Sequence, residues 1–68
     1  MKFNVGDKVY KPAGYRFVGE VLAAFVVPNR FPNMGGERYV VINSDGLMHI
    51  FNPGQLEHRV EPAPEYKL

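Results

Sequence analysis

Glycine and proline interrupt this chain so often that no stretch between them can hold a helix of several turns. Seven glycines and six prolines separate short segments that are rich in β-branched and aromatic residues. This spacing is typical of a small all-β barrel. It predicts five strands, over residues 8–11, 17–27, 39–42, 47–51 and 56–60. Gly19 lies inside the second of them and predicts a bulge or sharp bend where that strand curls around a barrel corner.

The connections follow local turn signals. The predicted connections are a loop over residues 28–36, a hairpin turn over residues 43–46 that ends in Asp-Gly, and a single helical turn over residues 52–55. From Glu61 onward, two prolines and no periodicity predict a disordered tail. The expected organisation is therefore one barrel domain over residues 1–60 and a tail over residues 61–68.

The chain is short for a domain that folds alone. Folding of a chain of 68 residues buries only about 60% of the surface of the unfolded chain. Domains of this size commonly gain stability from disulfides, a metal or partner subunits. Cysteine is absent, which excludes disulfides and thiolate metal sites. Only His49 and His58 offer imidazole ligands, so no metal is expected and oligomerisation is the remaining source of stability.

The third and fourth predicted strands are apolar on both faces. A strand with one face in water should alternate apolar and polar residues, yet residues 39–42 read Tyr-Val-Val-Ile. In the fourth strand one face carries Met48 and Ile50, and the other carries Leu47, His49 and Phe51. A small barrel has one interior, and an exposed apolar patch of this size is unusual on a monomer. We therefore expect a homo-oligomer; the alternative is a monomer whose local twist hides some of these residues.

Charge and hydropathy argue against membrane and nucleic-acid partners. Eight lysines and arginines against seven acids give a net charge of +1, far from the basic excess of a typical nucleic-acid binder. No apolar run is long enough to span a bilayer. Residues 1–4 lack the apolar region of a signal peptide. A cytoplasmic location is expected.

Conventional catalytic signatures are missing. Ser44 is the only serine and has no evident base beside it, and the glycines form neither a dinucleotide-binding fingerprint nor a phosphate loop. Two residues stand out instead. His49 lies in the middle of an apolar strand face, and Lys11 ends the first strand before a Pro-Ala-Gly turn. Taken alone, His49 is a structural histidine and Lys11 a solvated lysine.

Matches to one family run in order along most of the chain, from about residue 3 to residue 57. They are Gly6-Asp7-Lys8-Val9-Tyr10-Lys11, Gly14, Phe17, Gly19, Tyr39, Val41, Gly46-Leu47-Met48-His49-Ile50-Phe51 and Leu56-Glu57. Together they resemble the type II dihydrofolate reductases, the small plasmid-borne, trimethoprim-insensitive enzymes with an SH3-like barrel. The resemblance implies a five-stranded SH3-like barrel that assembles as a homotetramer with dihedral symmetry and one central pore.

In that family, a Val-Gln-Ile-Tyr strand from each subunit lines the pore and a lysine flanks the pore mouth. By position, Met48, His49, Ile50 and Phe51 stand on that strand, and Lys11 matches the lysine. His49 replaces glutamine and Phe51 replaces tyrosine. The resemblance makes His49, Ile50 and Phe51 the candidate catalytic residues. It makes Lys11, Met48, His49 and Ile50 the candidate cofactor-binding residues, with no metal.

The activity that the resemblance implies is NADPH-dependent reduction of dihydrofolate, insensitive to trimethoprim. Such a pore promotes hydride transfer by holding the nicotinamide and the dihydrofolate together, without a dedicated general acid. Two alternatives stay open: a non-catalytic oligomeric module with the same barrel, and a nucleic-acid-binding barrel. The scattered Arg16, Arg30 and Arg38 do not form the basic stripe that a nucleic-acid-binding barrel would use.

Overall fold

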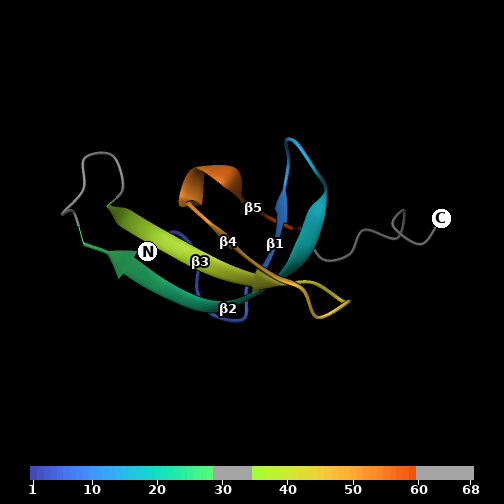
Figure 1. Ribbon diagram of the computed structural model, residues 1–68, viewed down its shortest axis with the longest axis horizontal. Helices are drawn as coiled ribbons and strands as arrows, with labels where there is room; N and C mark the ends of the chain where they lie inside the picture. Colours follow the sequence, from blue (N-terminus) through green and yellow to red (C-terminus); the bar gives the residue numbers. More distant parts are fainter. Residues whose placement is uncertain (29–34, 60–68) are drawn as a thin grey trace.

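A computed structural model of the chain describes residues 1–28 and 35–59. These residues form one antiparallel sheet of five strands in the order β4-β3-β2-β1-β5 (Figure 1). The strands are β1 (Lys8–Lys11), β2 (Phe17–Val27), β3 (Gly36–Ile42), β4 (Met48–Phe51) and β5 (Glu57–His58), and the 3-10 helix η1 (Pro53–Gln55) lies between β4 and β5. The all-β prediction, its five strands and its single helical turn are confirmed.

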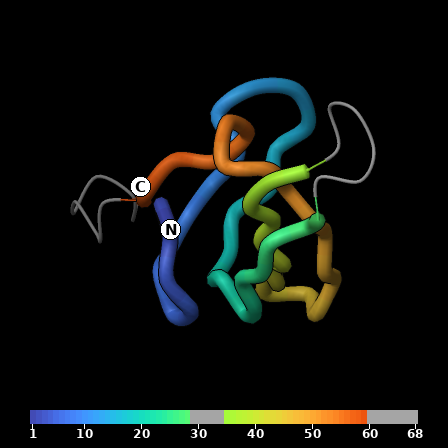
Figure 2. The backbone as a smooth tube through the Cα atoms, turned by 90° about the vertical axis from the view of Figure 1, so that its left-hand side faces the viewer, coloured from blue at the N-terminus to red at the C-terminus, as the bar shows by residue number. Residues whose placement is uncertain are grey.

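The sheet does not close into a barrel, so this part of the prediction is wrong for the single chain. Strands β4 and β5 are the two ends of the strand order, and within the described residues they do not pair with each other. β5 has only two residues, which pair with Val9 and Tyr10 of β1, and η1 occupies the chain between β4 and β5. Viewed along the long axis, the strands still curl around a common interior (Figure 2).

The curvature depends on a close approach of two backbones at Gly19. A Cβ atom at this position would overlap the carbonyl oxygen of Ile42 at the end of β3, so glycine is required for β3 to pass so near. The predicted bulge lies elsewhere in β2, because the register of the β2–β3 pairing shifts between Val21 and Ala23. Gly19 therefore permits the contact, and the extra residue that twists the strand comes after it.

One side of the curved sheet forms the core. Alternate strand residues point to this side, as strand geometry requires, and the N-terminal segment and the residue after η1 complete it. The buried residues are Phe3, Val9, Phe17, Val21, Tyr39, Val41, Phe51 and Leu56. The core therefore draws on every strand except the two-residue β5.

Tyr39 ties the N-terminal segment to β3. Its buried hydroxyl accepts hydrogen bonds from the backbone N–H groups of Lys2 (3.0 Å) and Phe3 (3.3 Å) and donates one to the carboxylate of Glu37. The Glu37 carboxylate also accepts a hydrogen bond from the backbone N–H of Lys2 (3.1 Å). The Tyr39 hydroxyl, followed by this N–H, lowers the pKa of Glu37. Burial, followed by the contact with Glu37, raises the pKa of Tyr39. The N-terminal segment thus closes the core through a charge-assisted network.

The other side of the sheet is also apolar at β3 and β4, as the double-sided pattern predicted. Met48 and Ile50 point away from the core and are 57% and 62% exposed. They pair with Ile42 and Val40, which are half-buried and share this side of the sheet. These four residues are termed the outer apolar face. Within the described residues, no other segment covers Met48 or Ile50.

Part of the prediction lies outside the described residues, namely the middle of the loop over 28–36, the end of the fifth strand at residue 60 and the tail over 61–68. Gly36, assigned to that loop by the sequence, instead begins β3. Among the described residues, no helix has the length and apolar character needed to cross a membrane.

Candidate functional site

The turn between β3 and β4 positions the strand that carries most of the predicted site residues. The side-chain oxygen of Asn43 accepts hydrogen bonds from the backbone N–H groups of Asp45 (2.9 Å) and Leu47 (3.0 Å). Gly46 takes a positive φ of 84°, a conformation that costs glycine little. This turn fixes the register of β4 against β3 and therefore decides which side each β4 residue faces.

Strand β4 lies at one end of the sheet and exposes its outer face and part of its inner face. His49 and Phe51 point to the core side, whereas Met48 and Ile50 point to the outer apolar face. Because β4 is the last strand in the order, its second edge pairs with no strand of the described residues. Met48, Ile50 and the half-buried His49 can therefore reach a molecule that lies along this edge.

His49 is held between aromatic rings. The ring of Phe17 stacks on the imidazole, with 4.5 Å between centroids and 24° between planes. The hydroxyl of Tyr15 lies 3.0 Å from Nδ1 of His49, and the ring of Phe51 lies 6.0 Å away, centroid to centroid. His49 is half-buried. One face and one edge of the imidazole are therefore occupied within the chain.

Lys11 joins the same group through Tyr15. Its ammonium lies 4.4 Å from the centroid of the Tyr15 ring, a cation–π arrangement. The same ammonium donates a hydrogen bond to the carbonyl of Ala13. A Cβ atom at Gly14 would overlap the Lys11 ammonium, so glycine leaves room for the lysine to fold back over the β1–β2 connection. Lys11, Tyr15, Phe17 and His49 are termed the His49 cluster.

The structure places the predicted site residues in three settings. Lys11 and His49 come together in the His49 cluster. Phe51 is only 1% exposed, so its ring belongs to the core and supports Phe17 at a centroid distance of 5.4 Å. Met48 and Ile50 lie on the outer apolar face, across the backbone of β4 from His49.

Tyr15 and the role of Phe17 beside His49 were missed by the sequence reasoning. The sequence alone places Phe17 at the start of the second strand and among the family matches, and it assigns no role to Tyr15. Their spacing gives no strand signal, because strand alternation applies only to extended segments and Tyr15 lies in the bend before β2. Tyr15 comes directly after the turn that brings β2 back along β1, which places it beside Lys11.

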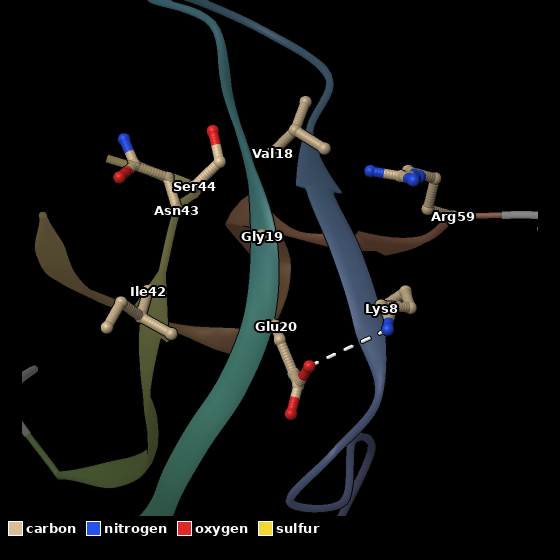
Figure 3. Close-up of a pocket in the computed structure, with 8 residues that line it drawn as sticks. All are labelled: Lys8, Val18, Gly19, Glu20, Ile42, Asn43, Ser44 and Arg59. Atoms are coloured by element: carbon tan, nitrogen blue, oxygen red, sulfur yellow. Dashed lines mark ion pairs between the residues drawn. The ribbon is translucent and has the colours of Figure 1, made fainter. Parts of the chain in front are cut away.

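A separate shallow depression of about 360 Å³ lies on the sheet (Figure 3). Its lining residues are Lys8, Val18, Gly19, Glu20, Ile42, Asn43, Ser44 and Arg59. Lys8 and Glu20 form an ion pair at 3.6 Å, and both side chains are close to half exposed, so the pair adds little stability. None of the predicted site residues lines this depression, and it is distinct from the His49 cluster.

The second histidine has a different setting. Nε2 of His58 lies 3.1 Å from the carboxylate of Asp7. The backbone N–H of Asn4 and then His58 lower the pKa of Asp7. This pair links the turn before β1 to β5. Within residues 1–28 and 35–59, no three His, Asp or Glu side chains lie together as metal ligands would.

Comparison of the chain with protein-family models, with curated proteins and with solved structures finds no match in any of the three. The likeness to the type II dihydrofolate reductases therefore rests on the ordered residue matches alone.

Proposed function

We propose that this chain is a type II-like dihydrofolate reductase that transfers hydride from NADPH to dihydrofolate in a pore shared by four subunits, insensitive to trimethoprim. The observation that carries the proposal is that β4 exposes Met48 and Ile50 on its outer side and part of His49 on its inner side. On the inner side, the half-buried His49 is linked to Lys11 through Tyr15. A ligand along the free edge of β4 would meet apolar, hydrogen-bonding and cationic groups together.

Each group has a role that matches the ligands. Ile50 and Met48 offer apolar surface to the nicotinamide and pteridine rings, and their exposure in the single chain leaves them available. His49 offers a hydrogen-bonding nitrogen, as the family's glutamine does. Lys11 supplies positive charge for the cofactor phosphates and the glutamate tail of the substrate. Phe51 acts from the core, by supporting the ring of Phe17.

The reaction needs no further side chain to act as an acid. When bound, NADPH would supply a hydride to the carbon of the C=N bond of dihydrofolate, and the nitrogen would take a proton from water. The protein contributes by holding the two rings in contact and in line, which converts a bimolecular step into an effectively unimolecular one. The open sheet and its outer apolar face favour assembly, because a second copy would cover Met48 and Ile50. Closed dihedral symmetry would bring four copies of β4 toward one channel.

The purified protein should oxidise NADPH in the presence of dihydrofolate, at a rate that trimethoprim leaves unchanged. His49→Ala should lose most of this activity because it removes the hydrogen-bonding nitrogen from the pore wall. His58→Gln is the matched control, since it changes the other histidine, which lies against Asp7. Equal activity in the parent and in His49→Ala, or no activity in the parent tetramer, would contradict the proposal.

One observation favours a second candidate, a non-catalytic oligomeric module. Phe51 is buried, and Phe17 covers one face of His49. This is expected if the two inner-face side chains of β4, His49 and Phe51, serve packing alone. A stable oligomer that neither binds NADPH nor reduces dihydrofolate would support this candidate over the reductase.

A further inference from the structure

We propose that Tyr15 fixes His49 as a hydrogen-bond donor, with the proton on Nε2, so that the site selects ligands that place an acceptor atom against that nitrogen. The identity of the ligand rests on the proposed function, whereas the position of the proton does not. Tyr15 is a positioning residue in this proposal, because it acts through His49.

The imidazole is restrained on two sides. Phe17 stacks on one face at a centroid distance of 4.5 Å, and Phe17 is itself almost fully buried. The hydroxyl of Tyr15 meets Nδ1 at 3.0 Å, a normal hydrogen-bond distance. The Tyr15 and His49 rings meet edge to face, with 5.6 Å between centroids. Rotation of the imidazole about its side-chain bonds would break the stacking and the hydrogen bond together.

Lys11 decides the direction of the hydrogen bond. Its ammonium lies 4.4 Å from the centre of the phenol ring, and a cation in this position draws electron density from the ring. The phenol therefore becomes a better donor and a poorer acceptor. Because Tyr15 is 54% exposed, water can donate hydrogen bonds to its phenol oxygen. A hydroxyl that donates to Nδ1 needs that nitrogen unprotonated, which places the proton of the neutral ring on Nε2.

Nε2 is the nitrogen left for a ligand. Within residues 1–28 and 35–59, Nε2 of His49 has no hydrogen-bond partner, and the side chain is half-buried. A fixed Nε2–H matches a carbonyl oxygen, such as that of a carboxamide or of a pteridine ring. The glutamine of the type II enzymes offers both a donor and an acceptor, whereas this site would offer the donor alone.

Nitrogen NMR tests the proton position directly, because the chain has only two histidines. Long-range proton–nitrogen spectra in buffer alkaline enough to keep imidazoles neutral distinguish the two tautomers. His49 of the parent should be protonated on Nε2. Tyr15→Phe, which keeps the ring over Lys11 and removes only the hydroxyl, should shift His49 toward the tautomer mixture of a free imidazole. Tyr10→Phe, which removes a hydroxyl bound to Glu57 at 3.1 Å, should leave His49 unchanged.

Two results would overturn the proposal: His49 protonated on Nδ1 in the parent, or an unchanged tautomer in Tyr15→Phe. Steady-state kinetics tests the second part of the proposal, the selection of ligands by Nε2–H. Tyr15→Phe should raise the KM of the ligand that accepts the hydrogen bond from Nε2–H, either NADPH or dihydrofolate, by about three- to tenfold. This is the effect of one hydrogen bond, and the change in kcat should be smaller. An altered tautomer with unaltered KM values would refute ligand selection by Nε2–H. The expected tautomers in a protein that does not reduce dihydrofolate would refute the proposed function and leave the role of Tyr15 standing.

Discussion

Phe17 and His49 stack with 4.5 Å between their ring centroids, although their strands are not neighbours in the sheet. Phe17 begins β2, His49 lies in β4, and β3 runs between these strands. The contact exists because the sheet curls until the inner sides of β2 and β4 meet. The geometry around His49 therefore depends on the curvature of the whole sheet as well as on the local sequence.

Gly19→Ala should disrupt that curvature. The added methyl group would overlap the carbonyl of Ile42, so we expect a loss of about 3 kcal/mol in the free energy of unfolding. Gly54→Ala is the matched control, because its Cβ would meet its nearest neighbour, Oδ1 of Asn52, at 3.4 Å. That change should stay within about 1 kcal/mol of the parent. Urea unfolding measures both variants, and equal stabilities would refute the close-approach explanation of Gly19.

Glu37 should make the free energy of unfolding depend on pH in the acid range. Its pKa is lowered in the folded chain by the Tyr39 hydroxyl and the Lys2 N–H, so the folded state prefers the carboxylate. This stabilisation is complete above the ordinary value of 4.5 and is lost as pH falls below it and through the lower folded pKa. Glu37→Gln keeps the acceptor oxygen but cannot titrate, so its urea midpoint should fall less steeply in acid.

Glu20→Gln is the control for this acid series. Glu20 is about half exposed in its ion pair with Lys8, so removing its charge should leave the acid dependence close to that of the parent. Parallel acid profiles for the parent and Glu37→Gln would show that the Tyr39 network does not contribute as described.

Local signals in the sequence predicted much of the sheet. Strands β1 and β2 begin and end as predicted, because Gly6-Asp7, the Pro-Ala-Gly turn and Pro28 mark their ends. β3 begins three residues earlier than predicted, at Gly36 rather than Tyr39. The added residues are a glycine and two charged residues that pair with the end of β2, and pairing with a partner strand is not a property of the local sequence.

The open sheet and the content of the site were harder to predict. Leu56 is buried like a strand residue but precedes β5, so its apolar character led to a predicted strand that begins one residue too early. The closed barrel was predicted from the spacing of glycines and prolines, which does not determine whether the two end strands pair. The division of β4 into two faces followed from alternation. The approach of Lys11 to His49 depends on Tyr15, whose place is set by the return of the chain after Gly14. Contacts of this kind arise from the tertiary structure.

Lys11 should act through its charge. In the proposed tetramer, four copies near the pore would attract the anionic NADPH and dihydrofolate, so Lys11→Met should raise the KM values for both by about tenfold and flatten their dependence on salt. Lys8→Met removes an equal charge from the depression, where Lys8 pairs with Glu20, and should change the kinetics little. Equal KM values and salt profiles for the parent and Lys11→Met would leave Lys11 without a role in ligand binding.

Ile50 should support assembly. Ile50→Lys places a charge in the outer apolar face, where burial of an unpaired charge between subunits is unfavourable, so light scattering should show smaller species than in the parent. Val5→Lys is the matched control, because Val5 is 64% exposed, close to the 62% of Ile50, and lies outside the sheet. Unchanged mass for Ile50→Lys would exclude the outer apolar face from the subunit interface.

The most direct test of the central claim is NADPH oxidation with dihydrofolate, measured across a dilution series while light scattering reports the mass of the same samples. The proposed tetramer predicts about four times the chain mass of 7.7 kDa at high concentration. It also predicts that activity per chain falls in step with the tetramer as the protein dissociates on dilution. A tetramer that does not oxidise NADPH, or a monomer that retains full activity, would contradict it.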